Sequence, residues 1–396
     1  MLTALSNAVG TVRDPNRNTK RHIRMPCACA RRSCRRTSSS CPNCTLPLNG
    51  VRRRLRLLMR GVLGLVLAIA MVAGVAASCD AGTLETIRSR GALVCGVADE
   101  AFGYSARDGR GDWSGLAVDF CRALAIAVLG RKEAVEFRET PPTNRFAALQ
   151  AGELDVLSTE TAVTATLDAG IGLRVPGILA YGGQGFLVRR AHGVTSALEL
   201  SGARVCVMGS SADAQGVIDY FAALKLPVEV VKIEGWNETV TAYRQKTCQV
   251  LSASVARLAA ARMSLGDTNA HVVLPELAAR HGYGPVIRQG DETWFSIVRW
   301  VMNVLVAAED LGVTSANAEQ LKTTGSADVR RLLVAGADLW GHFGLANDWP
   351  LQAIRQLGNY GELYERHLGA RSALRIERGR NNLASKGGLL YAPPFQ

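Results

Sequence analysis

The sequence predicts an α/β protein with two lobes and a ligand cleft between them. Short β-rich segments alternate with helical patterns from residue 84, and the same alternation restarts near residue 203. Strands separated by helices of this length are typical of sheets built largely from parallel strands. Extended segments at 182–190 and 284–289 could connect the halves. We therefore expect the chain to leave the first lobe at 182–190 and to return at 284–289, so that the residues after Trp294 complete that lobe.

The first half contains two expected strands and a long helix between them. The strands are residues 92–96 and 134–138. Four apolar residues recur every four positions between them, namely Leu116, Phe120, Leu124 and Val128. This spacing predicts a helix with one buried face. A second helical pattern, residues 145–152, leads into an expected strand at 154–158.

The second half repeats the alternation with more elements. The expected strands are residues 203–208, 228–233, 248–253 and 271–274, and the expected helices are 212–224, 238–246 and 255–264. Ligands of open α/β sheets bind beyond the carboxyl ends of the strands. We therefore expect the loops at 158–168 and 209–213 to face the cleft.

The net charge of +12 comes from one end of the 396-residue chain. Residues 1–60 hold fourteen Lys and Arg against one acid, Asp14, whereas the rest holds 32 basic against 33 acidic residues. A nearly neutral body without a basic stripe argues against nucleic acid as a partner.

Residues 59–78 have the features of a secretory signal. The basic run "VRRRLRLLMR" precedes the apolar "GVLGLVLAIAMVAGVAAS", which ends in small residues before Cys79. This order predicts that the chain is exported. Cys79 is a candidate for lipid attachment to the membrane, with ordinary cleavage or an uncleaved anchor as alternatives.

Translation could start at Met59, which would leave residues 1–58 as an untranslated or disordered basic extension. That segment contains "CPNC", for which a thiol pair or half a metal site is the alternative. Cys95, Cys121, Cys206 and Cys248 follow in the body. An even number of cysteines in an exported protein favours disulfides. Their order suggests Cys95 with Cys121 and Cys206 with Cys248, and four free buried thiols are the alternative.

The body carries no recognisable catalytic motif. GxSxG, HExxH, a Walker A loop and a clean GxGxxG are all missing, and the five histidines after residue 79 are scattered. Glu160 and Asp168 could act as an acid/base pair, but spacing alone is weak evidence and a solvated loop pair is the favoured explanation. Phe102 and Tyr104 lie in the loop after a strand, where a solute could stack on them, and packing in the core is an equal alternative. We expect no enzyme activity, no cofactor and no metal.

Several segments resemble the general L-amino-acid-binding proteins of bacterial ABC importers. They include "GDWSGLAVDFCRALA", "RFAALQAGELDVLS", "GPVIRQGDETWFSIVRW" and "NDWPLQAIRQLGNYGELYERHLG", and the resemblance spans about residues 83–396. The four body cysteines and the C-terminal "YAPP" match the family as well. The resemblance implies a two-lobed periplasmic binding fold (type II) that closes on a solute and delivers it to an ABC permease. The expected boundaries are 79–187 and 287–396 for the first lobe and 188–286 for the second.

The departures from the family fall at the expected solute site. Leu167 stands where the family has an arginine that clamps the α-carboxylate, and Ala162 replaces a hydroxyl residue. Ser254 stands where an acid would bind the α-ammonium. Loss of both charged contacts predicts weak or absent binding of ordinary α-amino acids, because an unpaired buried charge costs several kcal/mol.

We accordingly expect a monomeric solute-binding component of an amino-acid-type ABC transporter whose solute is altered or lost. The alternatives are an enzyme of the dehydratase type on the same scaffold, or an interaction protein outside transport. The expected solute-binding residues are Phe102, Tyr104, Glu160, Thr161, Thr164, Leu167, Ser210, Ser211 and Ser254.

Overall fold

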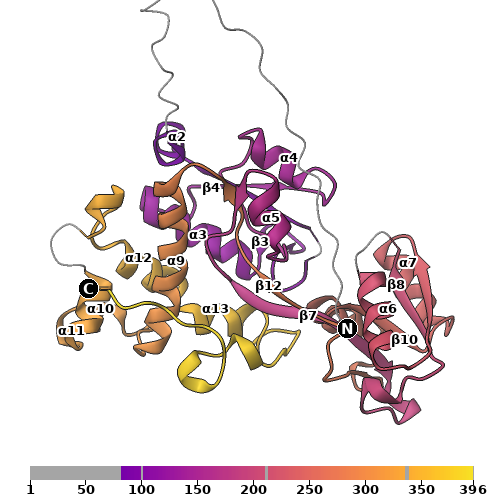
Figure 1. Ribbon diagram of the computed structural model, residues 1–396. Helices are drawn as coiled ribbons and strands as arrows, with labels where there is room; N and C mark the ends of the chain where they lie inside the picture. The colour runs from indigo at the N-terminus through magenta and orange to yellow at the C-terminus, as the bar shows by residue number, and fades with distance from the viewer. Residues whose placement is uncertain (1–81, 100, 210–212, 335–338, 396) are drawn as a thin grey trace, which may run out of the picture. The chain divides into compact units, whose positions relative to one another are not determined.

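The structure is a computed structural model that describes residues 82–99, 101–209, 213–334 and 339–395 (Figure 1). Every described residue belongs to one compact unit, which begins at residue 79. The expected extension 1–58, the signal 59–78 and Cys79 therefore lie outside the described residues, as do Ser210 and Ser211.

The first sheet has three parallel strands in the order β4-β1-β5. Its strands are β1 (Leu93–Val97), β4 (Val135–Glu139) and β5 (Val156–Leu157). All five residues of β1 are buried, as expected for a central parallel strand covered on both faces. The strands expected at 92–96 and 134–138 are confirmed as β1 and β4, each shifted by one residue. The strand expected at 154–158 is the shorter β5.

The long helix α3 (Leu116–Leu129) packs on β1 and also contacts α9 (Glu292–Asp310). Leu116, Phe120 and Leu124 are fully buried, which confirms the predicted apolar face. The helix ends at Gly130, whose φ of 75° is a left-handed conformation that glycine adopts without a steric penalty. The remaining elements of this region are α2 (Thr83–Arg90), β2 (Ala106–Arg107), β3 (Trp113–Ser114), α4 (Arg145–Gln150), α5 (Ala165–Gly170) and β6 (Leu173–Arg174).

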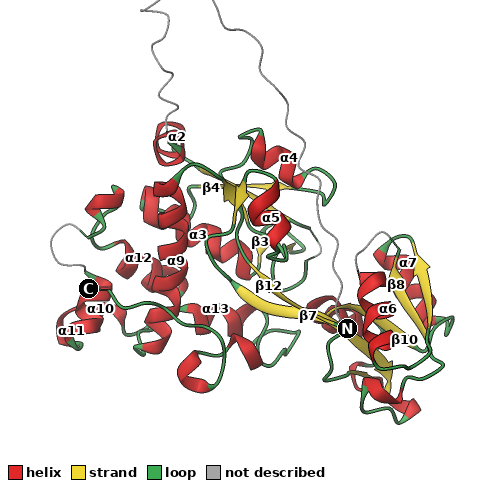
Figure 2. Ribbon diagram, viewed as in Figure 1, coloured by secondary structure: helices red, strands yellow, loops and turns green. Residues whose placement is uncertain are grey.

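The second sheet follows the order β11-β7-β10-β8-β9, and β12 also pairs with β7 (Figure 2). Its strands are β7 (Ala180–Arg189), β8 (Arg204–Met208), β9 (Glu229–Ile233), β10 (Val250–Ser254), β11 (His271–Val273) and β12 (Ala279–Tyr283). Strands β10, β8 and β9 are parallel, whereas β7 runs antiparallel to β10, β11 and β12. The segment expected to connect the lobes, 182–190, is thus the long strand β7.

Three helices accompany the second sheet, and the remaining helices follow it in the chain. Helices α6 (Asp213–Ala223), α7 (Trp236–Arg244) and α8 (Val255–Ser264) alternate with its strands. After the short β13 (Ile287–Arg288) and α9 come α10 (Ala318–Thr324), α11 (Ala327–Leu333), α12 (Trp349–Leu357) and α13 (Tyr360–His367). Helices α9, α12 and α13 all contact α3, so these helices pack beside the first sheet.

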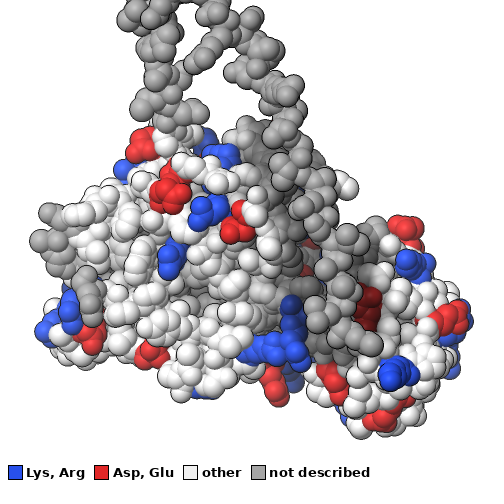
Figure 3. Space-filling view, viewed as in Figure 1, with Lys and Arg blue, Asp and Glu red and all other residues white. Residues whose placement is uncertain are grey.

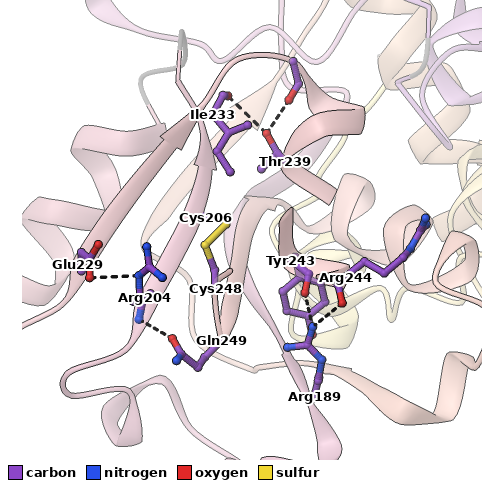
Figure 4. Close-up of a disulfide and its surroundings, with 11 residues drawn as sticks. Arg189, Arg204, Cys206, Glu229, Ile233, Thr239, Tyr243, Arg244, Cys248 and Gln249 are labelled. Atoms are coloured by element: carbon purple, nitrogen blue, oxygen red, sulfur yellow. Dashed lines mark hydrogen bonds and ion pairs between the residues drawn. A yellow bond between two sulfur atoms is a disulfide. The ribbon is translucent and has the colours of Figure 1, made fainter. Parts of the chain in front are cut away.

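Two disulfides join the cysteines as their order in the sequence predicted. Cys95 of β1 bonds to Cys121 of α3, and Cys206 of β8 bonds to Cys248 just before β10. Figure 4 shows the second bridge, with the ion pair between Arg204 and Glu229 beside it. Each bridge ties a strand to a neighbouring element within one sheet region. In the described part of the chain, no helix is long and apolar enough to cross a membrane.

Candidate functional site

The loop after β5 is held against the strands β12 and β13 by backbone hydrogen bonds. Leu157 and Val286 exchange two such bonds, and the Val163 N–H donates to the Gly282 carbonyl at 2.9 Å. The Ser158 N–H donates to Gly96 at the end of β1. Because the loop is held at both ends, residue 160 occupies a defined position between the two sheets' strands.

Glu160 is the charged residue of this loop, and its carboxylate accepts a hydrogen bond from the Ser254 hydroxyl. Burial raises the pKa of Glu160 to about 7, although the Arg257 guanidinium and the Ser254 bond oppose that shift. Asp213 raises the pKa further. A carboxyl that titrates near neutral pH and lies at a cavity is a candidate for contact with a ligand. The structure thus brings together Glu160 and Ser254, two of the expected solute-binding residues.

The threonines of the loop have local partners. The Thr161 side chain is buried, and its hydroxyl lies 2.6 Å from that of Thr159. Thr164 is exposed and caps α5, accepting a hydrogen bond from the Leu167 N–H. Both hydroxyls therefore serve the loop itself in this structure.

Leu167 lies in an apolar cluster of the first sheet region. Its side chain is only 5% exposed and packs in a cluster with Leu149, Leu157, Leu173 and Val286. Apolar packing of this kind is what a leucine contributes to a core. The side chain that stands at the family's arginine position is therefore part of the first lobe's core.

The aromatic residues Phe102 and Tyr104 lie at different cavities. Tyr104 is buried, and its ring meets that of Tyr283 edge-on at 5.7 Å between centroids. Phe102 is 38% exposed and lines a separate cavity of about 310 Å³ with Trp236 and Arg244. The sequence placed both beside one solute, whereas the structure separates them.

A cavity of about 370 Å³ contains Glu160 and Tyr104 in its wall. Strand β7 contributes Gly182 and Gly183, and α8 contributes residues from Val255 to Arg262. The other wall is the C-terminal segment 374–381, together with Tyr364 of α13. The volume is in the range of small-molecule sites, and the wall combines aromatic and apolar side chains with a few charged ones, as such sites do.

The two strand glycines allow β7 and β12 to come together at this cavity. A Cβ on Gly183 would lie 2.2 Å from the Ala279 carbonyl oxygen, and one on Gly182 would lie 2.5 Å from the Tyr283 ring. Any larger residue would force the two strands apart. The sequence "YGGQG" therefore has a structural reason that also shapes the cavity.

The C-terminal segment is fastened to β7 and to α9. The Asn381 side chain accepts from the Tyr181 N–H at 2.6 Å and donates to the Tyr181 carbonyl at 2.8 Å. Arg378 forms two hydrogen bonds with the Glu309 carboxylate, at 2.9 and 3.0 Å. The segment thus forms a fixed wall of the cavity.

Three arginines of the cavity wall, Arg262, Arg375 and Arg380, have side chains without a hydrogen bond or ion pair to any residue in the described ranges. The Arg262 Nε is also buried from solvent. Sequence analysis missed these three arginines, as well as Tyr181, Tyr283 and Asn381. The spacing of "RIERGR", residues 375–380, does not by itself indicate a cavity.

A second charged cluster lies around Asp119 of α3 and is fully paired. Asp119 accepts from His367 at 2.6 Å, from Arg122 at 2.7 Å and from Arg366 at 3.0 Å. Burial alone would raise the pKa of Asp119, but the bonds from His367 and Arg122 lower it to about 2. This cluster joins α3 to α13 and is a structural feature.

The arrangement gives no support to an acid/base pair of Glu160 and Asp168. Asp168 is exposed and lies 3.7 Å from the Arg174 guanidinium, and it is not part of the cavity wall that contains Glu160. Among the described residues, no group of three or more His, Cys, Asp or Glu side chains could hold a metal ion.

Two separate α/β sheet regions, with a cavity lined by residues of both, define the class of two-lobed solute-binding proteins. Comparison with known proteins identifies the family. Residues 93–312 match the family of bacterial extracellular solute-binding proteins, family 3. The chain belongs to this family, which confirms both the resemblance and the fold class predicted from the sequence.

The chain is similar to several named relatives over most of its length. It is 39% identical to the general L-amino acid-binding periplasmic protein AapJ of Rhizobium johnstonii, over 85% of this chain and 99% of that protein. It is 37% identical to the glutamate/glutamine/aspartate/asparagine-binding protein BztA of Rhodobacter capsulatus, over 83% of this chain and 98% of that protein.

A solved structure extends the comparison. The periplasmic binding protein of an ABC transporter from Brucella ovis, solved with glutathione bound, is 39% identical in sequence and has a TM-score of 0.74. It covers 79% of this chain, and the match includes 99% of that protein. Relatives with these names are transport binding proteins, which favours solute binding over the enzyme alternative.

Proposed function

We propose that this chain is the periplasmic solute-binding component of an amino-acid-type ABC importer and that its solute is an amino-acid derivative. The family and the named relatives support the transport role. Closure of two lobes around the solute creates the surface that the permease recognises, so no bond needs to form or break. The chain acts as a monomer, without a cofactor, a metal or catalytic chemistry.

The presence of Leu167 at the family's arginine position supports a solute other than a free amino acid. A bidentate arginine contact to a carboxylate is a strong charge-assisted pair, worth about 1.5–3 kcal/mol or more. Leu167 cannot supply it, and its side chain is packed in the first lobe's core. A free α-amino acid would therefore lack its carboxylate partner at this position.

Glu160 supplies a different charged contact. Its carboxylate lies at the cavity and accepts a hydrogen bond from Ser254, the residue at the family's acidic position. An ammonium group of a solute could pair with Glu160, particularly above pH 7 where the carboxyl is ionised. The ammonium partner would thus come from the first lobe and not from the second.

The Brucella ovis relative supports a solute larger than a free amino acid, because it was solved with glutathione. Glutathione is a peptide with one ammonium and two carboxylate groups. The cavity of about 370 Å³ is large enough for a small peptide of this kind. We therefore take glutathione as the first solute to test.

Calorimetric titration with the twenty amino acids and with glutathione tests the proposal. The expected result is measurable binding of glutathione and weak or undetectable binding of every free amino acid. Micromolar binding of a free amino acid would contradict the altered solute while leaving the transport role intact. If nothing binds, a decayed site or an interaction protein becomes the better explanation.

The double substitution Leu167→Arg with Ser254→Asp restores both family charges. We expect it to create amino-acid binding that the native protein lacks, with Leu167→Met as the control. Mass spectrometry of the exported protein tests whether residues 59–78 are removed and whether Cys79 carries a lipid.

A further inference from the structure

We propose that the pocket formed by Arg262, Arg375 and Arg380 binds the carboxylates of a solute whose ammonium group pairs with Glu160. This inference rests on the proposed function and names the chemical class of the solute as an elongated dicarboxylate derived from an amino acid. The three residues are called the arginine pocket below.

Three arginines from distant parts of the chain, Arg262, Arg375 and Arg380, line one cavity. Arg262 belongs to the last turn of α8, whereas Arg375 and Arg380 belong to the C-terminal segment. Arginines on unrelated surface loops would point to separate patches. Their common cavity also contains Glu160, so one molecule could contact both ends.

The side chains of Arg262, Arg375 and Arg380 have no hydrogen-bond or ion-pair partner among the described residues. Arg378, which lies among them, is held by Glu309 and by the rings of Tyr360 and Tyr364. No such contact involves Arg262, Arg375 or Arg380 in the described ranges. Glu377 also lies in the wall, yet it forms no ion pair with them. The free charge of the pocket is therefore positive, which favours an anionic ligand.

The backbone segment that carries Arg375 and Arg380 is fastened to the rest of the protein before any solute arrives. Asn381 pins the C-terminal segment to Tyr181 of β7, and Arg378 pins it to α9. Arg375 has a φ of 49°, an uncommon backbone conformation for a residue other than glycine. Groups that are already ordered lose less entropy when a ligand binds.

The shape of the cavity around these arginines fits a small solute better than the surface of a partner protein. The wall is concave and includes the rings of Tyr104, Tyr181 and Tyr283. Guanidinium groups bind carboxylates, and also phosphates, through two parallel hydrogen bonds, so a solute carboxylate fits this pocket chemically. Figure 3 shows Lys and Arg side chains gathered at the lower centre of the view, near the yellow C-terminal segment of Figure 1.

Titration calorimetry with glutathione and its diethyl ester tests the inference, because the ester keeps the ammonium and the length but lacks both carboxylates. We expect the native protein to bind glutathione about 10- to 100-fold more tightly than the ester, the range expected for charged hydrogen bonds. The triple variant Arg262→Gln/Arg375→Gln/Arg380→Gln should lose that advantage and bind the ester as the native protein does.

Arg371→Gln is the matched control, since Arg371 is an exposed residue before the same segment and outside the cavity wall. It should bind glutathione with native affinity. Thermal unfolding followed by circular dichroism must give the triple variant the same melting temperature as the native protein. A loss of binding can then be assigned to the three missing guanidinium groups. Inorganic phosphate serves as a competitor, and displacement of glutathione by millimolar phosphate would show a general anion site and overturn the carboxylate assignment.

The outcomes separate this inference from the proposed function. Equal affinity for glutathione and its ester, or native affinity in the triple variant, would overturn the arginine pocket and leave the transport role standing. Failure of the native protein to bind glutathione, its ester and all twenty amino acids would overturn both.

Discussion

The Asp119 cluster and the arginine pocket are two groups of charged side chains that differ in how they are paired. Asp119 is 3% exposed and accepts hydrogen bonds from two arginines and a histidine of the same chain. Arg262, Arg375 and Arg380 share a cavity and have no such partner in the described ranges. A buried charge that the protein neutralises itself contributes to the fold, whereas charges that converge without partners are available to a solute.

The two clusters also differ in what they join. The Asp119 cluster connects α3 to α13, so it fastens the C-terminal helices onto the first sheet region. The arginine pocket faces a space bounded by α8 and the C-terminal segment. Substitutions should therefore separate the clusters, with changes in stability at the first and changes in binding at the second.

Asp119→Ala should give the largest effect on stability. Removal of one member of a buried ion pair leaves the others unpaired and costs about 3–5 kcal/mol, and the partial exposure of Arg366 places this case near about 3 kcal/mol. The melting temperature should fall by about 6–10 °C. Asp328→Ala is the control, because its pair with Arg331 is exposed and should contribute less than about 1 kcal/mol. Equal effects of the two variants would contradict the comparison.

Acid should weaken the Asp119 cluster selectively. The folded-state pKa of Asp119 is lowered to about 2, so its contribution is present above the ordinary aspartate pKa and is lost as the pH falls toward 2. The free energy of unfolding in urea should be measured for the native protein and for Asp119→Asn at pH 6 and at pH 3. The difference between the two proteins should be smaller at pH 3. If the difference in the free energy of unfolding is the same at both pH values, the ionised Asp119 carboxylate does not contribute to stability.

Glu160 lies between these two cases, because its carboxyl has partners but they do not fully offset the rise in its pKa that burial causes. Its pKa is raised to about 7, so the folded state holds a proton between about pH 4.5 and 7 that the unfolded state releases. The free energy of unfolding should therefore fall by on the order of 3 kcal/mol as the pH rises through that range. Glu160→Gln should remove the decline, and Glu377→Gln, at the same cavity, should keep it.

The arginine pocket should give the smallest effect on stability. Arg375 and Arg380 are exposed and Arg262 is half-buried, and substitutions of side chains without partners at such positions usually change stability by less than about 0.5 kcal/mol. The triple glutamine variant should therefore unfold at the native urea concentration. Loss of more than about 2 kcal/mol would mean that these arginines have partners within the fold, and the contrast with Asp119 would disappear.

The sequence was sufficient to predict features that depend on local spacing or on the family. The helix over 116–128 followed from an apolar residue every four positions, and the two disulfides followed from the order of the cysteines. The family resemblance gave the fold class and the transport role. These features depend on residues that are close in sequence or on motifs that are specific.

The cavity wall could not be predicted, because it depends on contacts between distant residues. Asn381 and Tyr181 are 200 positions apart, and no periodicity connects them. The meeting of Glu160 with Ser254 likewise requires the loop after β5 to lie against β12. Leu167 and Ser254 were expected beside the solute by analogy with relatives, and their direct contact with a solute stays a prediction, as do the lobe boundaries.

A crystal structure of the protein with glutathione bound is the most direct test of the central claim. We predict that the ammonium group lies within hydrogen-bonding distance of Glu160 and that at least one carboxylate pairs with Arg262, Arg375 or Arg380. Glutathione bound elsewhere, with all three guanidinium groups in contact with solvent alone, would contradict it.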